Sequence, residues 1–267
     1  MKIVAKVGGS LVKRGLPATL LQDIKTVVSS NQVVLVHGGG DIVTEVATRL
    51  GKQQTFVTSP EGIRSRYTDK ETAELYSMVM SGKIATNLVL DLTAHEIKAV
   101  SVSGIDGRLL QGRRKKKLAV MDERGRKLMI DGGYTGRIES VNASLLDALM
   151  RDGYVPLVSP IALSEENELL NVDGDRAAAA LAKGIKADAV VFLTDVDGLI
   201  LDGELVEKLS VEEAKAKLPL IGFGMQKKVM AGVEATEGGV KEAIICSGVR
   251  PEPLQSAMMH RGCTVIA

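Results

Sequence analysis

Aromatic side chains are scarce in this 267-residue chain, at 3% of the residues, and tryptophan is missing altogether. The core must therefore be built from aliphatic side chains and methionine. Surfaces that bind single-stranded nucleic acid stack the bases on aromatic rings, and the net charge of this chain is only +1. Composition and charge together argue against a nucleic-acid-binding protein.

Cysteines and long apolar runs are also rare. The two cysteines, Cys246 and Cys263, lie in apolar stretches, and their number and spacing fit neither a disulfide framework nor a zinc site, so we expect buried, reduced thiols. No stretch approaches the roughly 18 apolar residues of a membrane span. The apolar run within MKIVAKVGGS is too short for a signal peptide. We therefore expect a cytoplasmic protein that does not interact with a membrane.

Three common nucleotide signatures are absent as well. The sequence contains no G-x-x-x-x-G-K-S/T phosphate loop, no G-x-G-x-x-G turn and no H-R-D catalytic loop. A nucleotide site in this chain would have to use other glycine-rich turns.

Short apolar runs alternate with helical patterns along most of the chain. Strands are predicted at residues 3–7, 33–37, 97–102, 155–158, 189–194, 243–246 and 263–266. Helices are predicted at residues 17–30 and 42–50, after a capping box at Thr68 and Glu71, and from Asp175, Met225 and Pro251. This alternation predicts an α/β fold with a mainly parallel sheet covered by helices on both faces. No Pro/Ser-rich linker interrupts it, so we expect one domain, 1–267, with two lobes that divide near residue 170.

Two glycine-rich turns follow predicted strands, at the ends where ligands gather in a parallel sheet. The first contains Gly8 and Gly9, and the second contains Gly38, Gly39 and Gly40 directly before a helix. Glycine lets the backbone approach a ligand closely, and N–H groups at a helix start suit an anion. Each turn alone could be a tight strand–helix connection, but the pair favours an anion site.

Lysines accompany these turns. Lys6 interrupts an apolar strand just before Gly8, and a buried lysine is costly unless it meets an anion. Lys227 and Lys228 begin a later helix, where a solvated helix turn is the simpler interpretation. Asp175 lies at the start of another helix, which it could cap, or it could hold two lysines in position.

Five motifs, in order over the whole chain, resemble those of the amino acid kinase family, in its acetylglutamate kinase branch. They are KVGGSLV, VHGGGDIV, NVDGDRAAAALA, LTDVDGLI and GFGMQKKVMAGVEA. The resemblance implies a three-layer αβα sandwich, with an N-terminal lobe of about 1–170 for the acyl substrate and a C-terminal lobe of about 171–267 for ATP. It also implies a homodimer, and Mg²⁺ held mainly by the ATP phosphates with no metal site made of protein side chains.

The resemblance also implies roles for single residues. Lys6 and Lys228 match lysines that stabilise the transferring phosphoryl group, and Asp175 matches the acid that organises them. The matches for substrate binding are Gly39, Gly40, Arg66, Asn171 and Tyr67, and the matches near the nucleotide are Gly8, Gly9, Thr194, Asp195 and Gly198. Arg66 would clamp the substrate α-carboxylate with its planar guanidinium, and Arg64 is the alternative.

A carboxylate acceptor accounts for the missing catalytic base. Its pKa is near ~4, so it is ionised at neutral pH without help. Catalysis then requires alignment of two anions and neutralisation of charge on the γ-phosphoryl group. None of the three histidines needs a catalytic role, although His37 could orient the glycine turn.

Two segments indicate which class of carboxylate is the phosphoryl acceptor. Residues 59–68 (SPEGIRSRYT) and 132–137 (GGYTGR) are similar to the archaeal and thermophile kinases of lysine biosynthesis. Those enzymes phosphorylate the side-chain carboxylate of α-aminoadipate, or of glutamate, while its amine is attached to a small acidic carrier protein, LysW. Arg137 occupies a position where acetylglutamate kinases typically carry an acidic residue.

A basic segment gives an independent reason for an acidic carrier. Residues 113–127, here named the basic insert, contain eight basic and two acidic residues and so carry a charge of +6. The basic residues are Arg113, Arg114, Lys115, Lys116, Lys117, Arg124, Arg126 and Lys127. Such a surface would steer an acidic carrier toward the site, whereas a solvated hairpin is the simpler alternative.

The sequence therefore predicts ATP-dependent phosphorylation of carrier-linked aminoadipate, glutamate or both. One alternative is an N-acetylglutamate kinase of arginine biosynthesis that acts on the free acetylated amino acid. Another is a nucleotide-binding regulator that keeps the fold without turnover. Dependence on the carrier separates the first two, and the retention of Lys6, Asp175 and Lys228 argues against the third.

Overall fold

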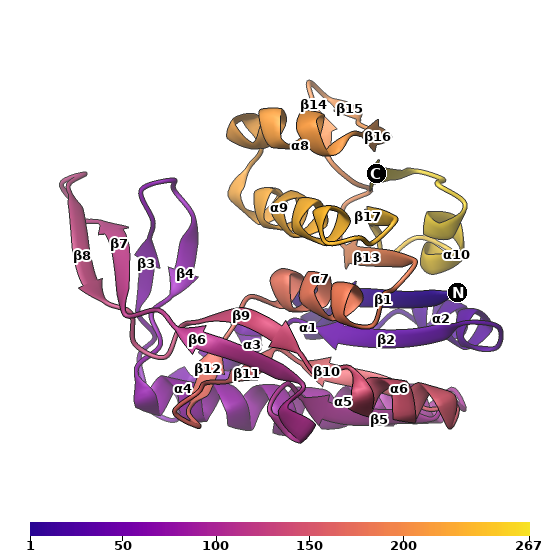
Figure 1. The fold of residues 1–267 in the computed structure, drawn as a ribbon, viewed down its shortest axis with the longest axis horizontal. Helices are drawn as coiled ribbons and strands as arrows, with labels where there is room; N and C mark the ends of the chain where they lie inside the picture. Colours follow the sequence, from indigo (N-terminus) through magenta and orange to yellow (C-terminus); the bar gives the residue numbers. More distant parts are fainter.

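A central eight-stranded sheet organises the computed structural model, which describes all 267 residues (Figure 1). Its strand order is β16-β18-β17-β13-β1-β2-β10-β5. In that order the bounds are Lys208–Leu209, Cys263–Ile266, Glu242–Ser247, Ala189–Thr194, Lys2–Val7, Gln32–His37, Val155–Ser159 and Ala99–Ser103. Neighbouring strands are parallel from β17 to β5, and β18 is antiparallel to β17. The mainly parallel sheet predicted from the sequence is confirmed.

Helices cover both faces of this sheet, because alternate strand residues point to opposite sides. In β1, Val4 packs into one apolar cluster, and Ile3 and Ala5 pack into the other. The first cluster is completed by α6 (Ser144–Arg151), α7 (Gly174–Gly184), α8 (Val211–Lys217) and α9 (Phe223–Glu237). The second is completed by α1 (Gly9–Arg14), α2 (Ala18–Val28), α3 (Gly40–Arg49), α4 (Lys70–Ser77), α5 (Ala85–Ala94) and α10 (Pro253–Met258). The three-layer αβα sandwich is confirmed.

Smaller sheets and hairpins lie at one end of the sandwich and above it. A four-stranded sheet has the order β12-β11-β6-β9, with bounds Leu169–Asn171, Ile161–Leu163, Leu110–Arg114 and Gly136–Val141. The hairpins are β3–β4 (Phe56–Thr58, Arg64–Arg66), β7–β8 (Lys117–Met121, Lys127–Asp131) and β14–β15 (Ile200–Leu201, Glu204–Leu205). Hairpins β3–β4 and β7–β8 are in contact and project together from the body of the molecule (Figure 1). The basic insert therefore forms the end of β6, all of β7, the turn that follows and the first residue of β8.

The capping box predicted at Thr68 is wrong. The N-cap of α4 is Asp69, whose carboxylate accepts a hydrogen bond from the Thr72 N–H at 2.7 Å. The Asp69 carboxylate, one residue after Thr68, thus accepts a hydrogen bond from one of the free N–H groups at the start of the helix, as the Thr68 hydroxyl was expected to do. Thr68 is fully buried, and its hydroxyl accepts a hydrogen bond from Asn171 Nδ2 at 2.9 Å. The Thr68 side chain therefore takes part in a tertiary hydrogen bond with Asn171 instead of capping the helix.

Helix boundaries differ from the sequence prediction by one or two residues elsewhere, as frayed ends usually do. A larger surprise is a π-helix, η1 (Met78–Ile84), which joins α4 to α5. Single turns of 3₁₀-helix occur at η2 (Asp106–Arg108) and η3 (Leu218–Leu220). No local sequence pattern had indicated the π-helix, which is rare and often lies near functional sites.

The two cysteines are free, buried thiols. They lie opposite each other, Cys246 on β17 and Cys263 on β18. Among the helices, none has both the length and the apolar character needed to cross a membrane.

Candidate active site

A cleft of about 1730 Å³ opens where the C-terminal ends of β1, β2 and β13 meet α7 and α9. Pockets for a single small ligand usually enclose about 300–1000 Å³. The cleft is therefore large enough for a nucleotide and a second substrate together.

The two glycine turns form one wall of the cleft and pack backbone against backbone. A β-carbon on Gly38 would lie 2.7 Å from the Gly9 nitrogen, and one on Gly9 would lie 3.2 Å from the Gly39 nitrogen. A β-carbon on Gly8 would lie 2.9 Å from the Leu193 carbonyl oxygen. Only glycine lets two turns approach this closely. The result is a surface of main-chain groups at the start of α1 and α3.

A buried ion cluster faces these turns. Lys6 Nζ lies 2.8 Å from Asp175 Oδ1, and Lys228 Nζ lies 3.3 Å from Asp175 Oδ2. Lys6 lies on strand β1 of the central sheet, Asp175 in the first turn of α7 and Lys228 in the second turn of α9. Gly174, the residue before Asp175, lies beside the Lys6 side chain: a β-carbon on it would be 3.5 Å from Lys6 Cε, an ordinary contact distance. The three residues singled out as catalytic candidates are thus in direct contact.

The cluster has two positively charged groups, Lys6 and Lys228, and one negatively charged group, Asp175. Burial alone would raise the pKa of Asp175, but the ammonium groups of Lys6 and Lys228 outweigh it and hold that pKa below its usual value. Burial lowers the pKa of Lys228, and Asp175 opposes this only in part. Two ammonium groups share one carboxylate, and uncompensated buried charge is costly. The cluster is therefore suited to a further anion. Asp175 does not cap α7; Asp173 does, by accepting hydrogen bonds from two backbone N–H groups.

Arg66, on β4, is the better placed of the two candidate arginines. It is 9% exposed and lines the cleft, and its Nη2 donates to the Gly40 carbonyl at 2.7 Å and to Thr44 Oγ1 at 2.9 Å. Its Nη1 donates to Gln54 Oε1. Three of the five guanidinium donors are used in this way, so two remain for a ligand. Arg64 also lines the cleft but is exposed, with its guanidinium 4.4 Å from the Phe56 ring centre.

Other predicted binding residues divide into two groups. Those that line the cleft are Gly8, Gly9, Gly39, Gly40, Asn171, Thr194 and Asp195. Tyr67 and Gly198 are not among the lining residues: the Tyr67 ring lies beside Gly133, and Gly198 packs against Thr264 and Leu205. No group of three or more His, Cys, Asp or Glu side chains is arranged to hold a metal ion.

The π-helix contributes two residues that the sequence had not indicated. Met80 and Ile84 press against the α-carbon of Gly39, where any β-carbon would collide with Ile84. Gly39 has φ of 153° and precedes α3. The π-helix η1 therefore packs directly against the second glycine turn.

His37 holds the same turn from inside the sheet. Its Nδ1–H donates to the Gly38 carbonyl at 3.0 Å, because a carbonyl can only accept, and its Nε2 then accepts from the Ser159 hydroxyl at 2.9 Å. Burial lowers the pKa of His37 to about 4. The imidazole is therefore neutral at physiological pH and orients the turn, as the sequence suggested.

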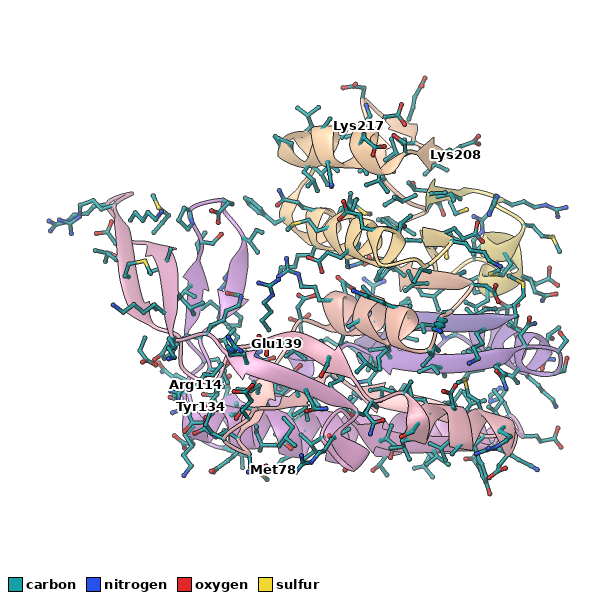
Figure 2. The ribbon with its side chains drawn as sticks, viewed as in Figure 1. Met78, Arg114, Tyr134, Glu139, Lys208 and Lys217 are labelled. Carbon is teal, nitrogen blue, oxygen red and sulfur yellow. The ribbon has the colours of Figure 1, made fainter.

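The basic insert lies at the mouth of the cleft. Leu118, Ala119 and Val120 of β7 are among the lining residues. At the base of the hairpin, Arg114 lies over the Tyr134 ring at 4.6 Å from its centre (Figure 2), and Arg113 pairs with Glu139 at 3.2 Å. The basic residues of the insert without an ion pair are Lys115, Lys116, Lys117, Arg124 and Lys127. An excess of positive charge therefore remains uncompensated beside the site.

Known proteins resemble the chain over its whole length. The amino acid kinase family pattern matches residues 1–247. A LysW-aminoadipate/LysW-glutamate kinase of Metallosphaera sedula is 46% identical over 264 residues, covering 98% of this chain and 99% of the relative. A Nitrosopumilus maritimus protein, which carries the same name provisionally, is 52% identical over 264 residues, covering 99% and 98%.

Among solved structures, N-acetylglutamate synthase of Neisseria gonorrhoeae shares the fold. Its TM-score is 0.79 at 24% identity, and the match covers 100% of this chain and 59% of that one. The family pattern, the full-length relatives and the shared fold agree with the motifs found in the sequence. The chain belongs to the amino acid kinase family.

Proposed function

We propose that this chain transfers the γ-phosphoryl group of ATP to the side-chain carboxylate of aminoadipate or glutamate carried on LysW. The observation that carries the proposal is the buried cluster of Lys6, Asp175 and Lys228, which has one more ammonium than carboxylate. Full-length relatives named LysW-aminoadipate/LysW-glutamate kinase, at 46% identity, support the choice of acceptor.

In this proposal the two lysines are the catalytic residues. An oxygen of the acceptor carboxylate attacks the γ-phosphorus, the bond to the β,γ-bridging oxygen breaks, and ADP leaves with that electron pair. Lys6 and Lys228 would neutralise negative charge on the transferring group, and Asp175 would hold them in position. The acceptor is ionised already, so no proton has to be removed.

The glycine turns and the neighbouring side chains would hold the two substrates. The amides of Gly8, Gly9, Gly39 and Gly40 suit phosphate and carboxylate oxygens. Thr194 and Asp195, which also line the cleft, would lie beside the nucleotide. Mg²⁺ would be bound mainly by the phosphates, as it is in many sites that bind a nucleotide.

For the acceptor, Arg66 would pair with its α-carboxylate through a free guanidinium N–H, and Asn171, which also lines the cleft, would contact the acceptor. Aminoadipate is longer than glutamate by one methylene, which is worth only about 1–3 kcal/mol of discrimination. An enzyme that uses both acceptors is therefore physically easy to build.

The basic insert would receive the acidic carrier. Its unpaired lysines surround a hairpin whose first strand lines the cleft, so a carrier bound there could deliver a tethered substrate over a short distance. Leu128 and Met129 are 44% and 58% exposed on the same hairpin and would add apolar contact. The proposal also includes a cytoplasmic homodimer and a division near residue 170 between the acyl-substrate lobe and the ATP lobe.

The test is acyl-phosphate formation from Mg-ATP, trapped with hydroxylamine, with four acceptors. These are N-acetylglutamate, N-acetylaminoadipate, carrier-linked glutamate and carrier-linked aminoadipate. Turnover of the carrier-linked acceptors alone is the expected result, and their ratio measures bifunctionality. Efficient turnover of free N-acetylglutamate would replace the proposal with the arginine-pathway kinase.

A further inference from the structure

Gly62 and the ring of Phe223 are in contact across the mouth of the cleft. They belong to the two elements that carry Arg66 and Lys228. Gly62 lies in the loop of hairpin β3–β4, and Phe223 is the first residue of α9. A β-carbon on Gly62 would lie 2.5 Å from one carbon of the Phe223 ring and 2.8 Å from another. The ring therefore rests directly on the glycine backbone, although 55% of the Phe223 residue is exposed.

A second contact reinforces the first. Lys227 Nζ donates a hydrogen bond to the Arg64 carbonyl at 3.2 Å. Phe223 and Lys227 are four residues apart, so they lie on the same face of α9. That face contacts hairpin β3–β4, whereas the next residue, Lys228, turns inward to Asp175.

One of the two elements that meet here is short. Hairpin β3–β4 has only three residues in each strand, and besides this contact with α9 it packs against hairpin β7–β8. The first turn of α9 begins at Phe223, between Gly222 and Gly224, and a β-carbon on either glycine would have no neighbour within 4 Å. The contact of Phe223 with Gly62 therefore joins the start of α9 to the hairpin. The hairpin carries Arg66 at its base, and the helix carries Lys228 one turn beyond the contact.

We infer that Phe223 is a positioning residue, whose ring on Gly62 aligns the acceptor clamp with the phosphoryl-binding lysine. This inference rests on the proposed function, because it assigns Arg66 to the acceptor and Lys228 to the phosphoryl group. Gly62 is required twice: its φ of +83° favours glycine, and a side chain would displace the ring. Loss of the contact between Phe223 and Gly62 should lower kcat, because a misplacement of about 1 Å between reacting groups can reduce the rate about 100-fold.

The kinetic test is a double-mutant cycle on Phe223→Ala and Gly62→Ala. Each single variant is expected to lower kcat about 10-fold, with a smaller change in the KM for ATP. The double variant should be no slower than Gly62→Ala, because both changes remove one contact. Additive losses, or a kcat of Phe223→Ala equal to that of the unmodified enzyme, would overturn the inference.

Matched controls are present elsewhere in the chain. Gly203 has the same φ of +83° in the turn of hairpin β14–β15, with nothing within 4 Å of a β-carbon. Gly203→Ala therefore imposes the same backbone strain without a contact across the cleft. Leu220→Ala removes a 73% exposed apolar side chain just before α9. Both controls should keep kcat.

A fluorescence measurement tests the contact without relying on turnover. The chain has no tryptophan, so Phe223→Trp introduces a single reporter at the contact. Adding Gly62→Ala to this variant should increase quenching of the tryptophan by acrylamide, and adding Gly203→Ala should not. Equal quenching in all three proteins would refute the contact. If the unmodified enzyme phosphorylates none of the four acceptors, the proposed function fails, and this measurement still decides the contact.

Discussion

The ion cluster of Lys6, Asp175 and Lys228 and the basic insert both carry excess positive charge, but they are built in opposite ways. The cluster is almost completely buried, with side-chain exposures of 8%, 7% and 14%, and its members come from three distant parts of the chain. The insert is contiguous in sequence, and most of its charges project into solvent on one hairpin. The cluster can act only on a group in contact with it, whereas the insert can act at a distance.

The difference follows from the dielectric surroundings. Charges in a water-excluded site interact strongly and are costly when unpaired, so they stabilise a developing charge effectively. Exposed charges are screened within about 8 Å at physiological ionic strength, and they chiefly accelerate encounter and select partners. Substitutions in the cluster should therefore change kcat, and substitutions in the insert should change KM and its dependence on salt.

The largest expected effect comes from Lys6→Ala. Removal of one preorganised positive group from such a site typically costs about 100- to 1000-fold in kcat, and the cluster would lose its excess charge. The measurement is steady-state acyl-phosphate formation with saturating substrates. Lys241→Ala, which removes an exposed lysine paired with Asp188, is the matched control. A Lys6→Ala enzyme with unchanged kcat would contradict the proposed role.

His37 is also buried, but unlike the ion cluster it is neutral at physiological pH. Because burial lowers its pKa to about 4, the unfolded chain binds the proton first as the pH falls below about 6.5. Stability is then lost progressively down to about pH 4, by about 3 kcal/mol in total. His37→Asn should remove this part of the pH dependence, measured as the free energy of unfolding by denaturant between pH 7 and pH 4. Parallel curves for the two proteins would contradict it.

The smallest effect is expected for the insert. Lys116→Glu with Lys117→Glu should raise the KM for the carrier-linked acceptor about 10-fold at low salt, leave kcat unchanged, and lose this effect as salt rises. Lys208→Glu with Lys217→Glu makes the same charge change beside α8, away from the insert (Figure 2), and should leave the KM unchanged. Equal KM values for both variants would identify the insert as a solvated hairpin.

Much of the fold could be predicted from the sequence, because hydrophobic periodicity reports burial directly. The apolar strands and glycine turns were identified in order, and Lys6 was conspicuous because a lysine does not belong in a buried strand without a partner. The N-cap of α4 was misplaced by one residue, since Thr68 and Asp69 both suit a cap and a tertiary hydrogen bond from Asn171 decided between them. The π-helix was missed because its signal is an irregular hydrogen-bonding pattern rather than a sequence motif.

By itself the sequence determined the α/β architecture with a mainly parallel sheet and the pair of glycine turns, since each depends on local composition and spacing. The candidate residues for phosphoryl transfer came from the resemblance to the amino acid kinase family. Only the tertiary structure decided which of these residues meet. It brought the ammonium groups of Lys6 and Lys228 within 3.3 Å of the Asp175 carboxylate, and it placed Phe223 on Gly62. It also left Tyr67 and Gly198 outside the lining of the cleft. The physical reason is that these contacts join residues far apart in the chain, and their geometry depends on how strands and helices pack rather than on any local pattern.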